Sequence, residues 1–585
     1  MRLGEASARF RLPTYAKRWM ILDLLGGVAG IIGGLGAVFF RMMISLNRFL
    51  FFDMLLPNIS LDVGSLNPAL ILLPALGGLL VGPIIMRLAP ETKGHGVPEV
   101  MEAVALRMGK IRKRVALLKV IVSSVTIGSG GSAGREGPIA QIGATIGSIL
   151  GQVFKLDFRD VKLLVVCGLS AGIAGTFNAP LGGAIFGMEI LYRGIGLFNA
   201  MPVILASVLG ATVASVFLGR SPAFKVVGAA SWTPLELPLY IFLGMVFGIL
   251  SVIWVRTFYG VESLFDKLKL IPHLKPAIGG LAVGFLGMLF LEYGVMGVGY
   301  EGINMVLAGE LALATLLSLG VVKLLATSLT IGSGGSGGVF APSLYIGSMF
   351  GGALGILFKM AFPLVVLDPK TYALAGMAAL FAGAAQAPIN VIIMIPEMSG
   401  DFALIPPIMA SSVTSFFVAW LFLRGSSIYT IKLEKRGIKI RMGRSFVLDS
   451  IKVGEIMNRN VISVSPDMPL RALEMMFEEY HHRGYPVVKN GKLVGIVTLD
   501  DLKKVPAWDR GDARVEDVAS RKLIVTYPDE SVHEALDKMY ENRVGRLPVV
   551  DRSDPSKIVG IISKHDILKA FEIAAERSAS QEFIE

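Results

Sequence analysis

Two glycine-rich stretches carry residue types that could bind a small anion without a metal ion. Residues 128–138 read GSGGSAGREGP and residues 332–342 read GSGGSGGVFAP. Glycine lets backbone N–H groups approach an ion closely, and hydroxyls and the positive ends of helix dipoles add further weak donors. Several weak donors allow release as well as binding, whereas cationic side chains alone would hold the ion too tightly. The two stretches therefore predict a site for a dehydrated halide or a similar anion.

Other interpretations of the same stretches are weaker. Both satisfy the glycine spacing of a dinucleotide-binding loop, but each follows an apolar helical run rather than a strand of a βαβ unit. Neither ends in the Gly-Lys-Ser/Thr of a P-loop. Close helix packing in lipid also favours small residues. The duplication of the whole stretch favours a function over packing alone.

The composition places most of the chain in a membrane. Of 585 residues 53% are hydrophobic and 17% are charged, and the mean hydropathy is +0.64, whereas soluble domains carry about 25% charge. The net charge of +11 is unevenly spread, at +15 in residues 1–444 and −4 in the rest, as expected for basic loops and an affinity for anions rather than for nucleic acid. Basic residues at the N-terminus and in a linker over 432–444 predict cytoplasmic ends and an even number of crossings. The N-terminus does not resemble a cleaved signal peptide.

An internal repeat organises the apolar part. Leu118–Pro138 matches Val322–Pro342, with Lys119 and Lys323 offset by 204 residues. Phe177–Pro180 followed by Glu189 recurs as Ala385–Pro388 followed by Glu397. Several apolar segments are cut by Gly and Pro and are too short to cross a bilayer, which indicates helices that end inside the membrane. We expect an all-α polytopic domain over 1–444, built from repeats at about 20–220 and 230–430 with broken helices.

The pattern changes after residue 444. Short β-branched runs alternate with amphipathic helices, and this pattern is itself duplicated. It predicts a tandem α+β module of two β-α-β-β-α units, over 445–510 and 511–585.

Four motifs in the apolar part resemble those of the CLC chloride channels and chloride/proton antiporters. Gly134–Pro138 (GREGP) resembles one signature of that family, Gly338–Pro342 (GVFAP) a second and Gly94–Pro98 (GHGVP) a third, and Tyr429 stands where the family has a pore tyrosine. The resemblance covers nearly all of residues 20–440. It implies a homodimer, with one anion pathway in each subunit formed by two inverted halves.

The resemblance also implies residue roles. Glu136 would be a gate whose carboxylate occupies an anion site until a proton or a competing anion displaces it, because a carboxylate offers the charge of chloride to the same donors. A structural alternative is that Glu136 neutralises Arg135 at a helix start. The backbone N–H groups of Val339 and Phe340 and the hydroxyl of Tyr429 would hold the inner anion. The complete set of implied anion-binding residues is His95, Gly96, Arg135, Gly137, Val339, Phe340 and Tyr429.

Two positions depart from the family pattern. His95 replaces the usual serine of the central site, which makes it a candidate pH sensor unless its ring points away into the protein. Ile190 occupies the position of the internal glutamate that relays protons, and isoleucine carries no proton. The neighbouring Glu189 is expected to have a helix-end role, mirrored by Glu397.

The C-terminal module resembles a pair of CBS domains, which bind adenine nucleotides or serve as dimer contacts. Thr498 and Asp501 in the first unit, and Ser563 and Asp566 in the second, match the family's ribose-and-phosphate motif. The hydroxyls would face phosphate and the carboxylates would face ribose hydroxyls. ATP, ADP or AMP is the expected ligand.

These observations favour a gated chloride channel with passive conduction, because Ile190 cannot relay protons. A chloride/proton antiporter of similar build is the alternative, and a CBS-regulated transporter of another ion is a third possibility. No nucleophile–base set indicates an enzyme, and His481-His482 lacks the further ligands of a metal site. We expect a multi-pass protein of the plasma or inner membrane, with the chloride ion as its cargo.

Overall fold

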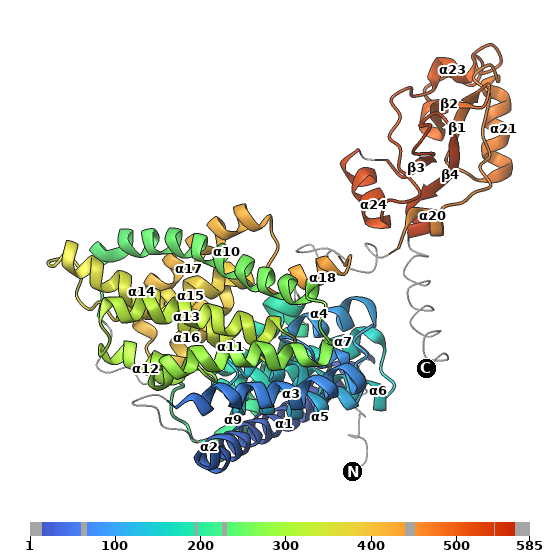
Figure 1. Cartoon of the computed structure of the whole chain (residues 1–585). Helices are drawn as coiled ribbons and strands as arrows, with labels where there is room; N and C mark the ends of the chain where they lie inside the picture. The colour runs from blue at the N-terminus through green and yellow to red at the C-terminus, as the bar shows by residue number, and fades with distance from the viewer. Residues whose placement is uncertain are drawn as a thin grey trace, which may run out of the picture. The chain divides into compact units, whose positions relative to one another are not determined.

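The structure is a computed structural model that describes residues 14–59, 67–192, 197–224, 231–438, 451–542 and 544–567. The chain divides into two compact units, Met1–Gly437 and Ile438–Glu585. The first unit is a helical bundle and the second is a mixed α/β module (Figure 1).

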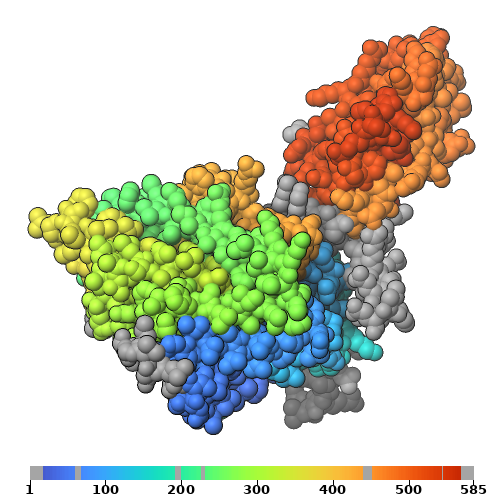
Figure 2. Space-filling model, viewed as in Figure 1, coloured from blue at the N-terminus to red at the C-terminus, as the bar shows by residue number. Residues whose placement is uncertain are grey.

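The helices of the first unit form two successive sets. The first set is α1 (Thr14–Arg48), η1 (Phe49–Leu55), α2 (Leu56–Ile59), η2 (Pro68–Ile71), α3 (Leu72–Leu88), η3 (Pro90–Thr92), α4 (Val97–Leu106), α5 (Arg114–Gly128), α6 (Glu136–Val153), α7 (Phe158–Phe177), α8 (Pro180–Phe186), η4 (Gly187–Tyr192) and α9 (Leu197–Leu218). The second set is η5 (Pro234–Glu236), α10 (Leu237–Lys267), η6 (Pro272–Leu274), α11 (Lys275–Leu289), η7 (Leu291–Tyr293), α12 (Tyr300–Ala308), α13 (Leu313–Gly332), α14 (Phe340–Ala361), α15 (Thr371–Ala385), α16 (Pro388–Ser399), η8 (Phe402–Leu404), α17 (Ile405–Leu423) and α18 (Thr430–Lys435). Figure 2 shows the first set in blue to blue-green and the second in green through yellow to orange.

Helices break at equivalent places in the two sets. Asn178 ends α7 and Gln386 ends α15, both in the left-handed conformation (φ 54° and 56°). An Ala-Pro pair follows each, so that α8 and α16 begin with proline at their first position, where its missing N–H costs no helical hydrogen bond. The predicted broken helices are confirmed.

Reciprocal contacts relate the two sets by an approximate two-fold axis. The hydroxyls of Ser123 and Ser336 lie 2.9 Å apart, and those of Ser132 and Thr327 lie 3.0 Å apart. Both pairs obey the 204-residue offset with the partners exchanged. Such exchange requires the sets to run in opposite directions where they meet, which confirms the inverted repeat.

Eight of the described helices are long and apolar enough to cross a membrane. Large apolar side chains face outward from them; Leu24, Phe217 and Phe417 are each more than half exposed. The interior instead holds many buried hydroxyls, including those of Ser123 and Ser336. This inside-out distribution suits a lipid surround, where outward apolar side chains are favourable and polar groups must find partners inside.

The second unit contains two similar halves. The first comprises α20 (Val453–Ile456), α21 (Leu470–Tyr480), β1 (Gly484–Lys489), β2 (Lys492–Thr498) and α22 (Leu499–Lys503), and the second comprises α23 (Val515–Val518), α24 (Val532–Glu541), β3 (Arg546–Val550) and β4 (Ile558–Ser563). Strands β1 and β2 pair antiparallel, as do β3 and β4. The expected first strand of each half is reduced to a single parallel bridge, Val464 to Val487 and Thr526 to Val549.

The two halves of the second unit exchange their leading segments. Val453 of α20 packs in the core of the second half, and Val515 of α23 packs in the core of the first. Backbone hydrogen bonds fix the exchange: Val453 N donates to Glu530 O, and Val515 N donates to Met468 O, both at 2.9 Å. Each core therefore depends on the other half of the module.

Candidate anion-binding site

Three backbone segments meet where the two sets of helices face one another. Gly134 and Gly338 exchange both of their N–H···O hydrogen bonds, at 2.8 and 2.6 Å. Gly94 N donates to Gly335 O at 3.0 Å, and Gly337 N donates to Gly94 O at 3.3 Å. The three motifs singled out in the sequence are thus joined directly by backbone hydrogen bonds.

Glycine is required at this junction because the backbones lie too close for a side chain. A Cβ on Gly137 would lie 2.0 Å from the carbonyl oxygen of His95. A Cβ on Gly338 would lie 2.6 Å from Glu136 Oε1 and 2.7 Å from Gly137 N. These approaches bring the first turns of α6 and α14 together, with their free N–H groups in one region.

Glu136 is the first residue of α6 and is buried. Its Oε1 accepts a hydrogen bond of 2.8 Å from the N–H of Ala341, in the first turn of α14. Its Oε2 has no hydrogen-bond partner among the described residues. The carboxylate therefore lies on a helix-start amide, which is where an anion would bind.

Arg135 does not neutralise Glu136 by direct pairing, since no ion pair within 4.0 Å joins these two described residues. The Arg135 guanidinium instead lies over the ring of Tyr300, 5.0 Å from its centroid, and donates to Thr176 O at 3.4 Å. Arg135 is thus held to one side of the carboxylate by an aromatic ring and a carbonyl.

Aromatic rings continue from the start of α14 toward α18. Phe340 lies 4.6 Å from Phe381, Phe381 lies 6.3 Å from Tyr429, and Tyr429 lies 5.6 Å from His95, all between ring centroids. Tyr429 is buried, and its hydroxyl makes no hydrogen bond to another described residue. A buried free hydroxyl is a donor available to an anion.

The sequence-predicted residues are thus gathered around one junction. Gly96 precedes α4 and lies against Gly137, and Val339 and Phe340 open α14. The sequence did not indicate Ala341 as the donor to Glu136, because which amide of a first turn faces the carboxylate depends on how α6 and α14 dock.

Two buried lysines were also missed. Lys119 Nζ donates to the carbonyl oxygens of Thr92 and Gly94, at 2.9 and 3.0 Å. Lys323 Nζ donates to the carbonyl oxygens of Gly294, Val295 and Gly297, each at 3.0 Å. Each lysine ties down the loop that leads into a short helix, α4 or α12. Their equivalent places in the repeat were the signal that could have revealed them.

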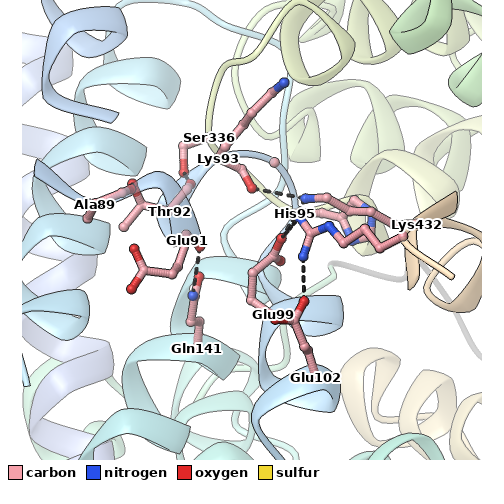
Figure 3. A network of polar contacts seen from close by, with 12 residues as sticks. Ala89, Glu91, Thr92, Lys93, His95, Glu99, Glu102, Gln141, Ser336 and Lys432 are labelled. Carbon is pink, nitrogen blue, oxygen red and sulfur yellow. Dashed lines mark hydrogen bonds and ion pairs between the residues drawn. The ribbon is translucent and has the colours of Figure 1, made fainter. Parts of the chain in front are cut away.

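A polar cluster surrounds His95 (Figure 3). His95 is buried; its Nε2 lies 3.5 Å from the hydroxyl oxygen of Tyr259, and its Nδ1 has no hydrogen-bond partner among the described residues. Beside it, Lys432 Nζ pairs with Glu99 Oε1 at 2.6 Å and donates to Lys93 O at 3.1 Å. Lys432, expected in the basic linker over 432–444, thus lies buried on α18.

Arg436 extends this cluster toward the surface. Its guanidinium pairs with Glu99 at 3.3 Å and with Glu102 at 2.6 Å. The cluster therefore fastens α4, which follows His95, to α18, which follows Tyr429.

Glu189 and Glu397 cap each other's helices across the two halves. The carboxylate of Glu397 accepts from the N–H groups of Leu181 and Gly182 in α8, at 3.0 and 2.6 Å. The carboxylate of Glu189 accepts from the N–H groups at the start of α16, those of residues 389 and 390, at 3.1 and 2.6 Å. Ile190 beside it is buried.

The tail residues of the nucleotide motif hold each other in capping boxes. Thr498 N–H and O–H both donate to Asp501 Oδ2, at 3.1 and 2.6 Å, and Ser563 and Asp566 make the same pair of bonds at 2.8 and 2.6 Å. Burial raises the pKa of the Asp501 carboxyl, but hydrogen bonds from Lys504 and Thr498 outweigh burial and hold the pKa below its ordinary value.

Buried broken helices in an inverted repeat, with helix starts meeting at a carboxylate, define a membrane transport protein. A family model described as voltage gated chloride channel matches residues 77–420, and CBS domain models match residues 453–507 and 515–573. The chain belongs to the voltage gated chloride channel family and carries two CBS domains.

Named relatives include channels and exchangers. The chain is 28% identical to "Chloride channel protein CLC-f" of Arabidopsis thaliana, over 83% of this chain and 71% of that one. It is 30% identical to "H(+)/Cl(-) exchange transporter ClcA" of Yersinia pestis, over 73% of this chain and 90% of that one. The predicted resemblance to chloride-transporting proteins is confirmed, while the relatives' names divide between channel and exchanger.

Solved structures share the fold. A slow cyanobacterial Cl⁻/H⁺ antiporter is 26% identical with a TM-score of 0.65, covering 71% of this chain and 97% of its own. A eukaryotic CLC transporter is 21% identical with a TM-score of 0.63, covering 94% of this chain and 98% of its own.

Proposed function

We propose that the chain is a chloride/proton antiporter in which Glu136 is both the gate and the proton carrier. The observation that carries the proposal is the Glu136 carboxylate lying 2.8 Å from the Ala341 amide, at the junction of the two repeats. An ionised carboxylate competes with chloride for this donor, and a protonated one does not. The carboxylate and chloride therefore exclude each other from one place, so that protonation of Glu136 and entry of chloride are linked, as a coupled exchanger requires.

The names of two similar proteins also support an antiporter. The chain is 30% identical to a transporter named as an H⁺/Cl⁻ exchanger, and the 26% identical solved structure is that of a Cl⁻/H⁺ antiporter. Among the described residues no cation pairs with Glu136, which also fits, because a tightly paired carboxylate would accept a proton only with difficulty.

Passive conduction through a gated chloride channel is the second candidate. Ile190 favours it, because a buried isoleucine beside the occupied Glu189 leaves no acid at the position where the family relays internal protons. In this case Glu136 would open and close the path without carrying protons across.

Reconstituted vesicles distinguish the two. An outward chloride gradient is expected to drive protons inward against their own gradient, recorded with a pH electrode. Chloride efflux without proton movement would replace the antiporter by the channel, and no chloride efflux at all would contradict both. Glu136→Gln is expected to keep chloride flux, abolish proton coupling and flatten the pH dependence, whereas the matched control Glu310→Gln, an exposed acid, should change neither.

We further propose a homodimer in the plasma or inner membrane, with both ends of the chain on the cytoplasmic side and adenine nucleotide bound by the CBS pair. Asp501 and Asp566 would contact ribose and Thr498 and Ser563 would contact phosphate, which requires the capping boxes to open partly. Calorimetry with ATP, ADP and AMP tests this, and no heat from any of them would leave the pair a structural role.

A further inference from the structure

The hydrogen bonds of Tyr259 determine which nitrogen of His95 carries a hydrogen. A tyrosine hydroxyl has one hydrogen to donate, and Tyr259 donates it to the carbonyl oxygen of Ile428 at 2.5 Å. Toward His95 Nε2, 3.5 Å away, the phenol oxygen can only accept. The contact is therefore attractive only when Nε2 carries a hydrogen, and in a neutral ring this leaves Nδ1 with a lone pair.

That lone pair lies on a ring that borders the candidate anion site. His95 Nδ1 is buried without a hydrogen-bond partner among the described residues, and the His95 ring lies 5.6 Å from the Tyr429 ring. An unpaired buried acceptor is costly. It would also repel an anion that the free Tyr429 hydroxyl could otherwise bind.

The charges around His95 attract an anion nevertheless. The charged and titratable groups that face it from the surrounding elements are Glu99 on α4, Lys119 on α5, Tyr259 on α10, Tyr429 before α18, Lys432 on α18 and Arg436 after it. Three of them are cations and one is an acid. Burial of the ring and this excess of positive charge both oppose protonation of His95, and a bound chloride reduces the second of these.

We propose that chloride binds beside Tyr429 together with a proton on His95 Nδ1, so that the inner anion site takes up the two ions as a pair. A proton from water forms the Nδ1–H bond, the ring becomes an imidazolium that donates from Nε2 to Tyr259 and from Nδ1 to chloride, and no covalent bond to chloride forms. The inference rests on chloride being the transported anion and adds a second proton-binding group to Glu136, in a chain whose usual relay position is Ile190.

Equilibrium binding to the full-length Glu136→Gln protein in detergent tests the pairing, because this variant removes the proton linkage of Glu136 itself. Calorimetric titration with sodium chloride in weak buffer should show uptake of up to about one proton per chloride bound. On the alkaline side the apparent Kd should rise by about tenfold per pH unit, as required when one proton accompanies each ligand.

Two double variants isolate His95. Glu136→Gln with His95→Asn should bind chloride without proton uptake and with a Kd independent of pH. Glu136→Gln with Tyr259→Phe should show uptake well below one proton per chloride, since the neutral ring is then free to carry its hydrogen on Nδ1. The tyrosine variant decides the question alone if the histidine variant does not fold.

Chloride binding to Glu136→Gln with no proton uptake would overturn the inference, because a change of tautomer would then suffice. Unchanged uptake after His95→Asn would also overturn it, since another group would be the acceptor. The antiporter fails by a separate result, namely chloride efflux from wild-type vesicles without uphill proton movement.

Discussion

The buried ion pair between Glu99 and Lys432 is expected to make the two residues mutually dependent. Their side chains are 7% and 9% exposed, and Nζ lies 2.6 Å from Oε1. The pair joins α4, which follows His95, to α18, which follows Tyr429. The perturbation is a cycle of Glu99→Gln, Lys432→Met and the double variant.

The contacts of the pair predict which of the three variants loses most free energy of unfolding and which loses least. Removing one partner of a buried pair costs about 3–5 kcal/mol because the other charge is left uncompensated. The destabilisation by Glu99→Gln should lie near the upper end of this range, since the variant leaves the Lys432 ammonium unpaired beside Arg436. Lys432→Met should lie nearer about 3 kcal/mol, because Arg436 still reaches Glu99 at 3.3 Å. The double variant should cost less than either single change, since neither buried charge remains unpaired.

Unfolding in mixed detergent micelles, followed by tryptophan fluorescence, measures the cycle. Lys435→Met is the matched control, because Lys435 pairs with Glu262 at 3.3 Å but is 40% exposed, so its removal should cost no more than about 1 kcal/mol. Additive losses in the double variant would refute the reasoning, because they would mean that the two charges do not compensate one another.

Three further predictions follow from single contacts. Gly338→Ala should reduce chloride efflux by about 100-fold, because its Cβ would displace Glu136 and Gly137 N. Gly260→Ala in α10 should leave efflux unchanged, because apart from its own helix no described atom lies within 4 Å of the added Cβ. Glu189→Gln and Glu397→Gln should each destabilise the protein by about 1.5–3 kcal/mol in micelle unfolding, and clearly unequal losses would argue against equivalent caps. Because the pKa of Asp501 is lowered in the folded tail, its carboxylate stabilises the tail at pH values above the ordinary pKa near 3.8, and this stability is lost as the pH falls below that value. In urea unfolding of a 451–567 fragment, Asp501→Asn should therefore lose less stability on acidification than the wild-type fragment.

Much of the scaffold could be predicted because the residues that start and end its helices act locally. Proline at 180 and 388 and glycine-rich stretches before α6 and α14 mark helix ends whatever the surroundings. Whether the two halves are parallel or inverted could not be predicted, because a duplicated sequence fits both arrangements equally well. The exchange of hydrogen bonds between Gly134 and Gly338 decides it.

The site shows the same limit. Glu136 and Tyr429 were indicated by motifs, but the pairing of Glu99 with Lys432 joins residues 333 positions apart. A lysine in a basic run is usually solvated, so no local pattern separates Lys432 from its neighbours. Tyr259 was also missed, because an aromatic residue in an apolar helix usually packs against its neighbours. Its role depends on a hydrogen bond to Ile428, which lies 169 positions later in the chain.

The residues proposed to bind ions lie at positions where the two halves of the repeat differ. Residues that build the frame are the same in both halves: Lys119 and Lys323 tie the loops, Gly134 and Gly338 share a backbone pair, and Glu189 and Glu397 cap opposite helices. The residues proposed to handle ions are not. Glu136 opens α6 but Phe340 opens the equivalent α14, and His95 precedes the glycine before α4 where Val298 precedes the glycine before α12. A fully symmetric frame would present one set of groups from both sides, so an anion would meet the same barrier in either direction. Under the proposed function, unlike residues at equivalent places would give the pathway two different ends, one closed by the Glu136 carboxylate and one lined by His95 and Tyr429.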